Sequence, residues 1–256
     1  MSNIVTISNH KGGVGKTTSA LNLGAGLATL GETVLLVDLD PQANLSQSLG
    51  IREPVNHVYG SIRGEYPLTP VEILSGLDLI PSTLDLSGAE IELSAETGRE
   101  YILRELLEPL RNRYDYILID SPPSLGLLTI NALTASQEVF IPLQAQYLAL
   151  QGLSKLVEVI EKIQKRLNTS LRIGGVFITQ YDSRKVLNRN VVETIEAHFK
   201  DRVFTTRIRD NVALAEAPTA GLDIFRYAPK SYGAKDYLAL ATEIKNLHRR
   251  KAKATQ

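Results

Sequence analysis

The sequence contains no cysteine, and this absence excludes disulfides, thiolate metal sites, iron–sulfur clusters and a cysteine nucleophile. Its four histidines show no spacing typical of metal ligands. No apolar run approaches the roughly 20 residues that a membrane-spanning helix needs. The N-terminus also lacks the charged and apolar regions of a signal peptide. We therefore expect a cytoplasmic protein that does not act in a membrane.

The remaining composition is that of an ordinary globular protein. The chain has 256 residues, of which 43% are hydrophobic and 22% charged. This is enough apolar surface to offset the conformational entropy lost on folding. We find no repeat, low-complexity segment or linker, so the sequence predicts a single domain over residues 1–256, with a flexible basic tail from about 249 to 256.

Short β-branched or aliphatic runs alternate along the chain with longer amphipathic stretches. This alternation is typical of βαβ units, and it predicts a three-layer, doubly wound α/β fold with a mostly parallel sheet and helices on both faces. Residues 51–70, which are rich in proline and glycine, are expected to form an irregular surface segment. The predicted strands are residues 4–8, 33–37, 77–80, 116–119, 139–143, 173–179 and 203–206, and the predicted helices are residues 16–30, 98–113, 150–167, 191–199 and 232–250.

The strongest motif, NHKGGVGKTT at residues 9–18, lies between the first predicted strand and the first predicted helix. Glycines let successive backbone N–H groups converge on an anion, and the helix N-terminus adds the positive end of its dipole. In such a loop Lys16 would reach the outer phosphates of a nucleotide and Thr17 would bind Mg²⁺. The standard P-loop pattern requires a glycine where this chain has His10, and an extra lysine, Lys11, follows. The predicted nucleotide-binding residues of the loop are Lys11, Gly12, Gly13, Val14, Gly15, Lys16, Thr17 and Thr18.

A dinucleotide-binding fingerprint is the main alternative interpretation of this loop. Gly13 and Gly15 supply its first two glycines, and Asp38 ends the next strand near the position of the expected acidic residue. The third glycine of the fingerprint is replaced by Thr18. A lysine inside the loop is also unnecessary for a pyrophosphate, so the sequence favours a P-loop.

Two apolar strands are predicted to end in acidic residues. One runs into Asp38 and Asp40, and the other into Asp120. The carboxyl ends of parallel strands form the ligand-binding edge of α/β folds, so carboxylates placed there beside a P-loop are candidate Mg²⁺ ligands. The predicted metal ligands are Thr17, Asp40 and Asp120, with Asp120 in the Walker B position.

Residues 11–18 resemble the deviant Walker A motif of the ParA/MinD superfamily of P-loop ATPases. Residues 38–42 and 120–126 are similar to the switch segments of that superfamily, and further matches at 128–133 and 216–218 extend the resemblance over nearly the whole chain. The sequence is most similar to small ParA/Soj-type ATPases that partition chromosomes or plasmids. The resemblance implies a P-loop NTPase fold, with ATP and Mg²⁺ as cofactors.

The resemblance also implies a homodimer in the ATP-bound state. In the family the extra lysine, here Lys11, reaches the phosphates of the partner subunit, and Asp40 matches the aspartate that positions or activates the attacking water. With Lys16, these are the implied catalytic residues. Pro218 falls in the loop that the family builds beside adenine, although this chain departs from the family sequence within residues 208–214. Hydrolysis is expected to be slow until a ParB-like partner completes the site.

The charges of the chain cancel in total but not along its length. Residues 1–128 carry 8 basic and 16 acidic side chains, whereas residues 129–256 carry 20 and 12, and residues 184–253 alone carry 15 and 8. Such an excess fits a solvated surface, or a surface that binds duplex DNA without reading its sequence. The resemblance favours DNA and an association with the nucleoid, and Arg184 matches a family position tied to DNA binding. The candidate DNA-binding residues are Arg184, Lys185, Arg189, Arg207 and Arg209.

The same fold carries other functions, and the residues of this chain bear on each of them. A ParA-like ATPase that positions a protein cargo, such as a chemotaxis cluster or a microcompartment, would differ only in its adaptor, so the sequence does not separate it from a partition ATPase. MinD-type regulators end in an amphipathic membrane helix, but this chain ends in HRRKAKATQ, which has no apolar face. A small-molecule P-loop enzyme, such as a dethiobiotin-synthetase-like ligase, gains no support from Lys11 or from the basic half.

Overall fold

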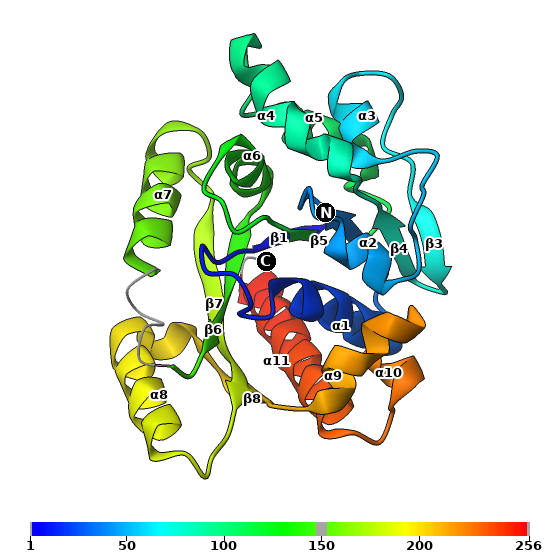
Figure 1. The fold of residues 1–256 in the computed structure, drawn as a ribbon. Coiled ribbons are helices and arrows are strands. Elements are labelled where there is room, and N and C mark those ends of the chain that lie inside the picture. Colours follow the sequence, from blue (N-terminus) through cyan, green and yellow to red (C-terminus); the bar gives the residue numbers. More distant parts are fainter. Residues whose placement is uncertain (1, 147–152, 255–256) are drawn as a thin grey trace.

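The computed structural model describes residues 2–146 and 153–254, which fold around one eight-stranded sheet (Figure 1). The strand order is β3-β4-β2-β5-β1-β6-β7-β8, and every neighbouring pair is parallel except β3 and β4. The predicted doubly wound, mostly parallel α/β fold is therefore confirmed. The strands are β1 (Asn3–Ile7), β2 (Val34–Asp38), β3 (Val71–Leu74), β4 (Leu77–Ile80), β5 (Tyr116–Asp120), β6 (Glu138–Gln144), β7 (Arg172–Tyr181) and β8 (Val203–Arg209).

Helices cover both faces of the sheet. On one face α1 and the long α11 pack against alternate residues of the strands. On the other face α3, α5 and α6 cover the half around β2 and β5, and α7 and α8 cover the half around β6 and β7. The helices are α1 (Lys16–Thr29), α2 (Asn44–Ser48), α3 (Val58–Ile62), α4 (Ala89–Glu92), α5 (Ile102–Leu107), α6 (Leu127–Ala135), α7 (Leu153–Arg166), α8 (Val186–Phe199), α9 (Val212–Glu216), α10 (Ile224–Tyr227) and α11 (Tyr232–Ala254).

The central strands are buried on both faces, which explains why they read as continuous apolar runs. Every residue of β2 (VLLVD) and β5 (YILID) is buried. In an alternating strand one face would meet water, whereas a parallel strand between two helical layers must be apolar throughout. An acidic residue at the end of such a run therefore lies at the carboxyl edge of the sheet, where the polypeptide leaves the core.

The structure differs from the predicted elements in several places. The helix predicted over 98–113 is shorter, because α5 spans only Ile102–Leu107 and is followed by a 3₁₀ turn that contains Pro109. The basic tail predicted to be flexible from 249 instead continues α11 as far as Ala254. Part of the helix predicted over 150–167 lies outside the described residues. Several elements were not predicted at all. They include the antiparallel edge strand β3, the almost completely buried α6, and α3 inside the segment expected to be irregular, as well as the short helices α2, α4, α9 and α10.

A buried ion-pair cluster fastens the end of α11 to the sheet. Glu138, at the start of β6, is 3% exposed, and it accepts hydrogen bonds from Arg172 at 2.6 Å, Lys251 at 2.8 Å and His248 at 3.1 Å. Burial alone would raise the pKa of Glu138, but the hydrogen bonds from His248, Lys251 and Arg172 outweigh it and hold this pKa well below its usual value. The cluster therefore stabilises the fold while Glu138 is ionised.

We predict that Glu138→Gln lowers the free energy of unfolding by about 1–3 kcal/mol at pH 7, because it removes the negative charge that Arg172 and Lys251 face. Since the folded protein holds the pKa of Glu138 below its ordinary value of 4.5, the stabilisation is complete above that pH and is lost as the pH falls below it. Urea denaturation at pH 7 and pH 4 should show a smaller difference between the two proteins at pH 4. Glu193→Gln, on the exposed side of α8, is the control and should change little.

Candidate functional site

The glycine-rich loop follows β1 and leads directly into α1. β1 lies between β5 and β6, so the loop emerges at the middle of the sheet's carboxyl edge. Gly15, the residue before α1, has a left-handed φ of +86°, and no side chain caps the helix. The first N–H groups of α1 therefore remain available to bind an anion.

The loop borders a cavity of about 480 Å³. Gly13 has a φ of +74°, which favours glycine, and a Cβ added to Gly12 or Gly13 would meet no protein atom within 4 Å. The backbone of the loop is thus open on this side, as the approach of a phosphate requires. The cavity brings together most of the predicted nucleotide-binding residues with Asp40, and it is lined by Gly12, Gly13, Gly15, Lys16, Thr17, Thr18, Asp40, Gln42, Asn44, Ser48, Pro123 and Gln180.

Lys16, the first residue of α1, is largely buried, with 7% of its surface exposed. Burial lowers the pKa of Lys16, while the nearby carboxyl groups of Asp120 and Asp40 raise it. Among the residues that the structure describes, its ammonium group donates one long hydrogen bond of 3.3 Å, to the carbonyl oxygen of Lys11. An anionic ligand in the cavity would supply the acceptors that this buried cation needs.

Asp120, at the end of β5, is completely buried. Neither of its carboxylate oxygens has a hydrogen-bond partner of normal geometry among the residues that the structure describes. Burial, followed by the neighbouring Asp38, raises the pKa of Asp120 well above its usual value, although Thr17 and Lys16 oppose the rise. A cation beside this carboxylate would hold it in the ionised form.

These residues fit a magnesium ion. Mg²⁺ takes oxygen ligands and is usually bound by one or two carboxylates together with phosphates and waters. Thr17 and Asp40 line the cavity and carry such oxygens. Asp120 is not a lining residue, but it interacts with Thr17 and Lys16, which are. Within residues 2–146 and 153–254 no group of three or more His, Asp or Glu side chains forms a metal cage made by the protein alone.

The two aspartates at the end of β2 have different environments. Asp38 is fully buried and accepts hydrogen bonds from the backbone N–H (2.8 Å) and the hydroxyl (2.7 Å) of Ser46, and burial raises its pKa to about 6. Ser46 in turn accepts a hydrogen bond from the backbone N–H of Ser82. Asp38 therefore fixes the fold of the segment between β2 and α2, whereas Asp40 lines the cavity. Sequence reasoning missed the serine network, because Ser46 and Ser82 carry no motif.

Lys11 lies beside the cavity but does not line it. Its ammonium group donates a hydrogen bond of 3.1 Å to the side-chain oxygen of Gln146, which belongs to the same chain, and its backbone N–H donates to Asn9. The two lysines of the loop are thus directed differently, since Lys16 is buried within the site and Lys11 is at its edge.

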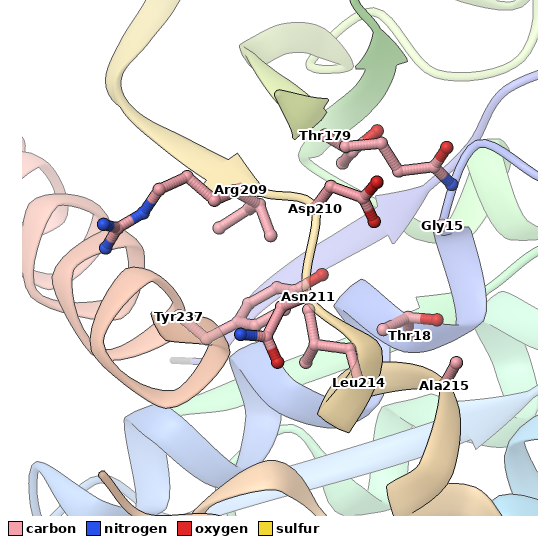
Figure 2. Close-up of a pocket in the computed structure, with 11 residues that line it drawn as sticks. Gly15, Thr18, Thr179, Arg209, Asp210, Asn211, Leu214, Ala215 and Tyr237 are labelled. Carbon is pink, nitrogen blue, oxygen red and sulfur yellow. The ribbon is translucent and has the colours of Figure 1, made fainter. Parts of the chain in front are cut away.

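A second, smaller pocket of about 150 Å³ adjoins the first and shares Gly15, Thr18 and Gln180 with it. Figure 2 shows Asp210 directed toward Gly15, while Arg209 extends the other way, toward α11. Arg209 forms an ion pair of 2.5 Å with Asp236 and stacks on Tyr232, which accounts for its direction. Pro218 is not among the lining residues, which are Gly15, Thr18, Thr179, Gln180, Ile208, Arg209, Asp210, Asn211, Leu214, Ala215 and Tyr237.

The candidate DNA-binding residues fall into two groups near the ends of β7 and β8. Arg184, Lys185 and Arg189 are exposed in the segment that opens α8, and Arg184 forms a bidentate ion pair with Asp182. The second group lies on β8 and is already engaged in ion pairs, Arg207 with Glu196 and Arg209 with Asp236.

The glycine loop, the buried Lys16 and the acidic strand ends together define the nucleotide site of a P-loop NTPase. The sequence matches, over residues 2–173, a family described as an AAA domain. It is 48% identical to the sporulation initiation inhibitor protein Soj of Bacillus subtilis, over 95% of this chain and 98% of that protein, and 46% identical to the chromosome partitioning protein ParA of Caulobacter vibrioides, over 98% and 97%. The chain belongs to the ParA/MinD family of P-loop ATPases and is close to its Soj type.

The fold also matches solved structures. A cobyrinic acid a,c-diamide synthase from Mycobacterium smegmatis, crystallised with ADP and magnesium, superposes with a TM-score of 0.84 at 35% identity, over 94% of this chain and 93% of that one. In the described part of the chain, no helix has the length and apolar character needed to cross a bilayer.

We predict that Asp120→Asn raises the free energy of unfolding by about 1–3 kcal/mol in the absence of ligand, because it removes a buried negative charge whose cost of burial Thr17 and Lys16 offset only in part. The folded protein raises the pKa of Asp120, so wild-type stability falls as the pH rises above the ordinary value of 3.8, and the advantage of the variant should be larger at pH 8 than at pH 5. The same variant should bind ATP without the usual enhancement by Mg²⁺. Asp38→Asn, which disturbs the hydrogen bonds with Ser46, should instead be destabilised, and urea denaturation distinguishes the two.

Proposed function

We propose that this protein is a ParA-type partition ATPase whose ATP-bound form is a sandwich dimer. In this proposal the dimer binds DNA without sequence preference, and hydrolysis stimulated by a ParB-like partner releases it, which segregates plasmid or chromosomal DNA. The protein would then act in the cytoplasm, on the nucleoid. Its cofactors are ATP and Mg²⁺.

The position of Lys11 is the observation that carries the proposal. Lys16 already supplies a buried cation to the cavity, and a second cation with the same task would add a further desolvation cost. The Lys11 ammonium lies at the edge of the site, where it donates a hydrogen bond to the neutral side chain of Gln146. From there it can meet phosphate oxygens supplied by a second subunit, where a charge-assisted hydrogen bond offsets its loss of water.

The remaining residues have separate tasks in this proposal. Thr17 and Asp120 would hold Mg²⁺, which neutralises charge on the transferred phosphoryl group, and Lys16 would bind the same phosphates. Asp40, which lines the cavity, would orient the attacking water. None of the described residues that line the cavity is an arginine. We propose that basal hydrolysis is slow, as in the family, because the described lining of the cavity supplies no arginine finger in cis.

One solved relative, named a cobyrinic acid a,c-diamide synthase, favours amide ligation as a second candidate function. The 48% identity to Soj, over nearly all of both chains, gives partition the stronger support. A pull-down in ATP from the native host tests the choice between partition and amide ligation. The identity of the recovered protein also distinguishes a ParB-like partner from a cargo adaptor.

We predict that ATP with Mg²⁺ converts the wild-type monomer to a dimer and that Lys11→Ala remains monomeric while still binding ATP. Light scattering with and without nucleotide measures the first property, and fluorescence of a labelled ATP analogue measures the second. Asp40→Ala should accumulate as the ATP-bound dimer, because hydrolysis no longer resolves it. An ATP-dependent dimer of Lys11→Ala would contradict the proposal.

We predict ATP-dependent binding to DNA of arbitrary sequence. The affinity should fall steeply as the salt concentration rises, because the release of counterions from the DNA is then less favourable. Arg184→Ala should lower the slope of log affinity against log salt concentration by about 1 and leave dimer formation intact. Arg166→Ala, on the exposed end of α7, is the matched control and should retain the slope. Equal DNA affinity in ADP, or an unchanged slope in Arg184→Ala, would count against this surface.

A further inference from the structure

Gln180, the penultimate residue of β7, has an unusual backbone conformation. Its φ is +51°, in the left-handed region that favours glycine. A residue with a side chain is held there only when its surroundings require it, and such residues gather at functional sites. The side chain of Gln180 lines both the 480 Å³ cavity and the smaller pocket beside it.

Two glutamine amides hold one carbonyl group of the phosphate loop. The Gln180 side-chain N–H donates to the carbonyl oxygen of Gly13 at 3.1 Å, and that of Gln144 donates to the same oxygen at 2.7 Å. Gln144 also donates to the side-chain oxygen of Gln180 at 2.8 Å, which closes the triangle. Next to it, the Thr179 hydroxyl donates to the carbonyl oxygen of Val14 at 2.9 Å.

These contacts fix the directions of two backbone N–H groups as well. A trans peptide is planar, so its C=O and N–H groups point in opposite directions. Holding the Gly13 carbonyl toward β6 and β7 therefore turns the N–H of Val14 away from these strands. The Thr179 contact does the same for the N–H of Gly15. Successive N–H groups turned to one side form the concave anion site of a phosphate loop.

We propose that Gln180 is a positioning residue for the nucleotide phosphates and that it acts through the Gly13 carbonyl, together with Gln144. Its strained backbone lets the amide reach back from the end of β7 to the loop. The proposal rests on the ATP-binding part of the proposed function. It adds a residue outside the glycine loop that sets the geometry of the loop before nucleotide binds.

The decisive variant is Gln180→Gly, because glycine accepts the positive φ while the amide is lost. We expect its melting temperature to stay at the wild-type value or rise, while its affinity for ATP·Mg²⁺ falls five- to tenfold, the range expected for one lost hydrogen bond. In steady-state hydrolysis KM should rise by the same factor with kcat retained. Gln180→Glu, which keeps the shape but cannot donate a hydrogen bond when ionised, should lose at least as much affinity.

Lys200→Gly provides a matched control. Lys200 also has a positive φ, of +52°, and it precedes β8 in a 3₁₀ turn that does not line either cavity. This variant relieves the same type of strain and should bind ATP like the wild type. Wild-type affinity in Gln180→Gly, or a joint loss of melting temperature and affinity, would overturn the positioning role. Failure of the wild-type protein to bind ATP would instead overturn the proposed function.

Discussion

Asp120 is held at the end of β5 with no exposed surface and no hydrogen-bond partner of normal geometry among the described residues. Burial makes ionisation unfavourable, and the neighbouring Asp38 adds to this effect. Lys16 is the corresponding cation: it is also buried, and this burial lowers its pKa. A nucleotide bound with its metal ion would supply counter-charges to both groups, which is why we propose that this edge of the sheet holds ATP and Mg²⁺.

The phosphate loop depends on parts of the chain far from it in sequence. Its outward carbonyls are bound by Gln144, Thr179 and Gln180, from the ends of β6 and β7. The loop's inner face is thereby left open, with glycine at the positions whose backbone is left-handed. Tertiary hydrogen bonds thus complete what glycine alone only permits, because glycine allows the required conformation without favouring it over others.

Sequence reasoning identified the central strands and the loop, because both follow from local rules. Parallel strands buried on two faces must be apolar, and glycines between a strand and a helix indicate an anion site. It failed where the signal was not local. α6 is buried on nearly all sides, so it has no amphipathic period, and β3 is a short edge strand. The glutamines that hold Gly13 lie more than 130 positions away in sequence and belong to no motif, so only the assembled sheet brings them to the loop.

Helix α11 joins two distant regions of the molecule. Its 23 residues extend over roughly 34 Å, with Tyr237 in the wall of the smaller pocket near one end and His248 and Lys251 bound to Glu138 near the other. The wall of the smaller pocket and the Glu138 cluster therefore share one element of secondary structure. A displacement of α11 along the sheet would alter both regions together.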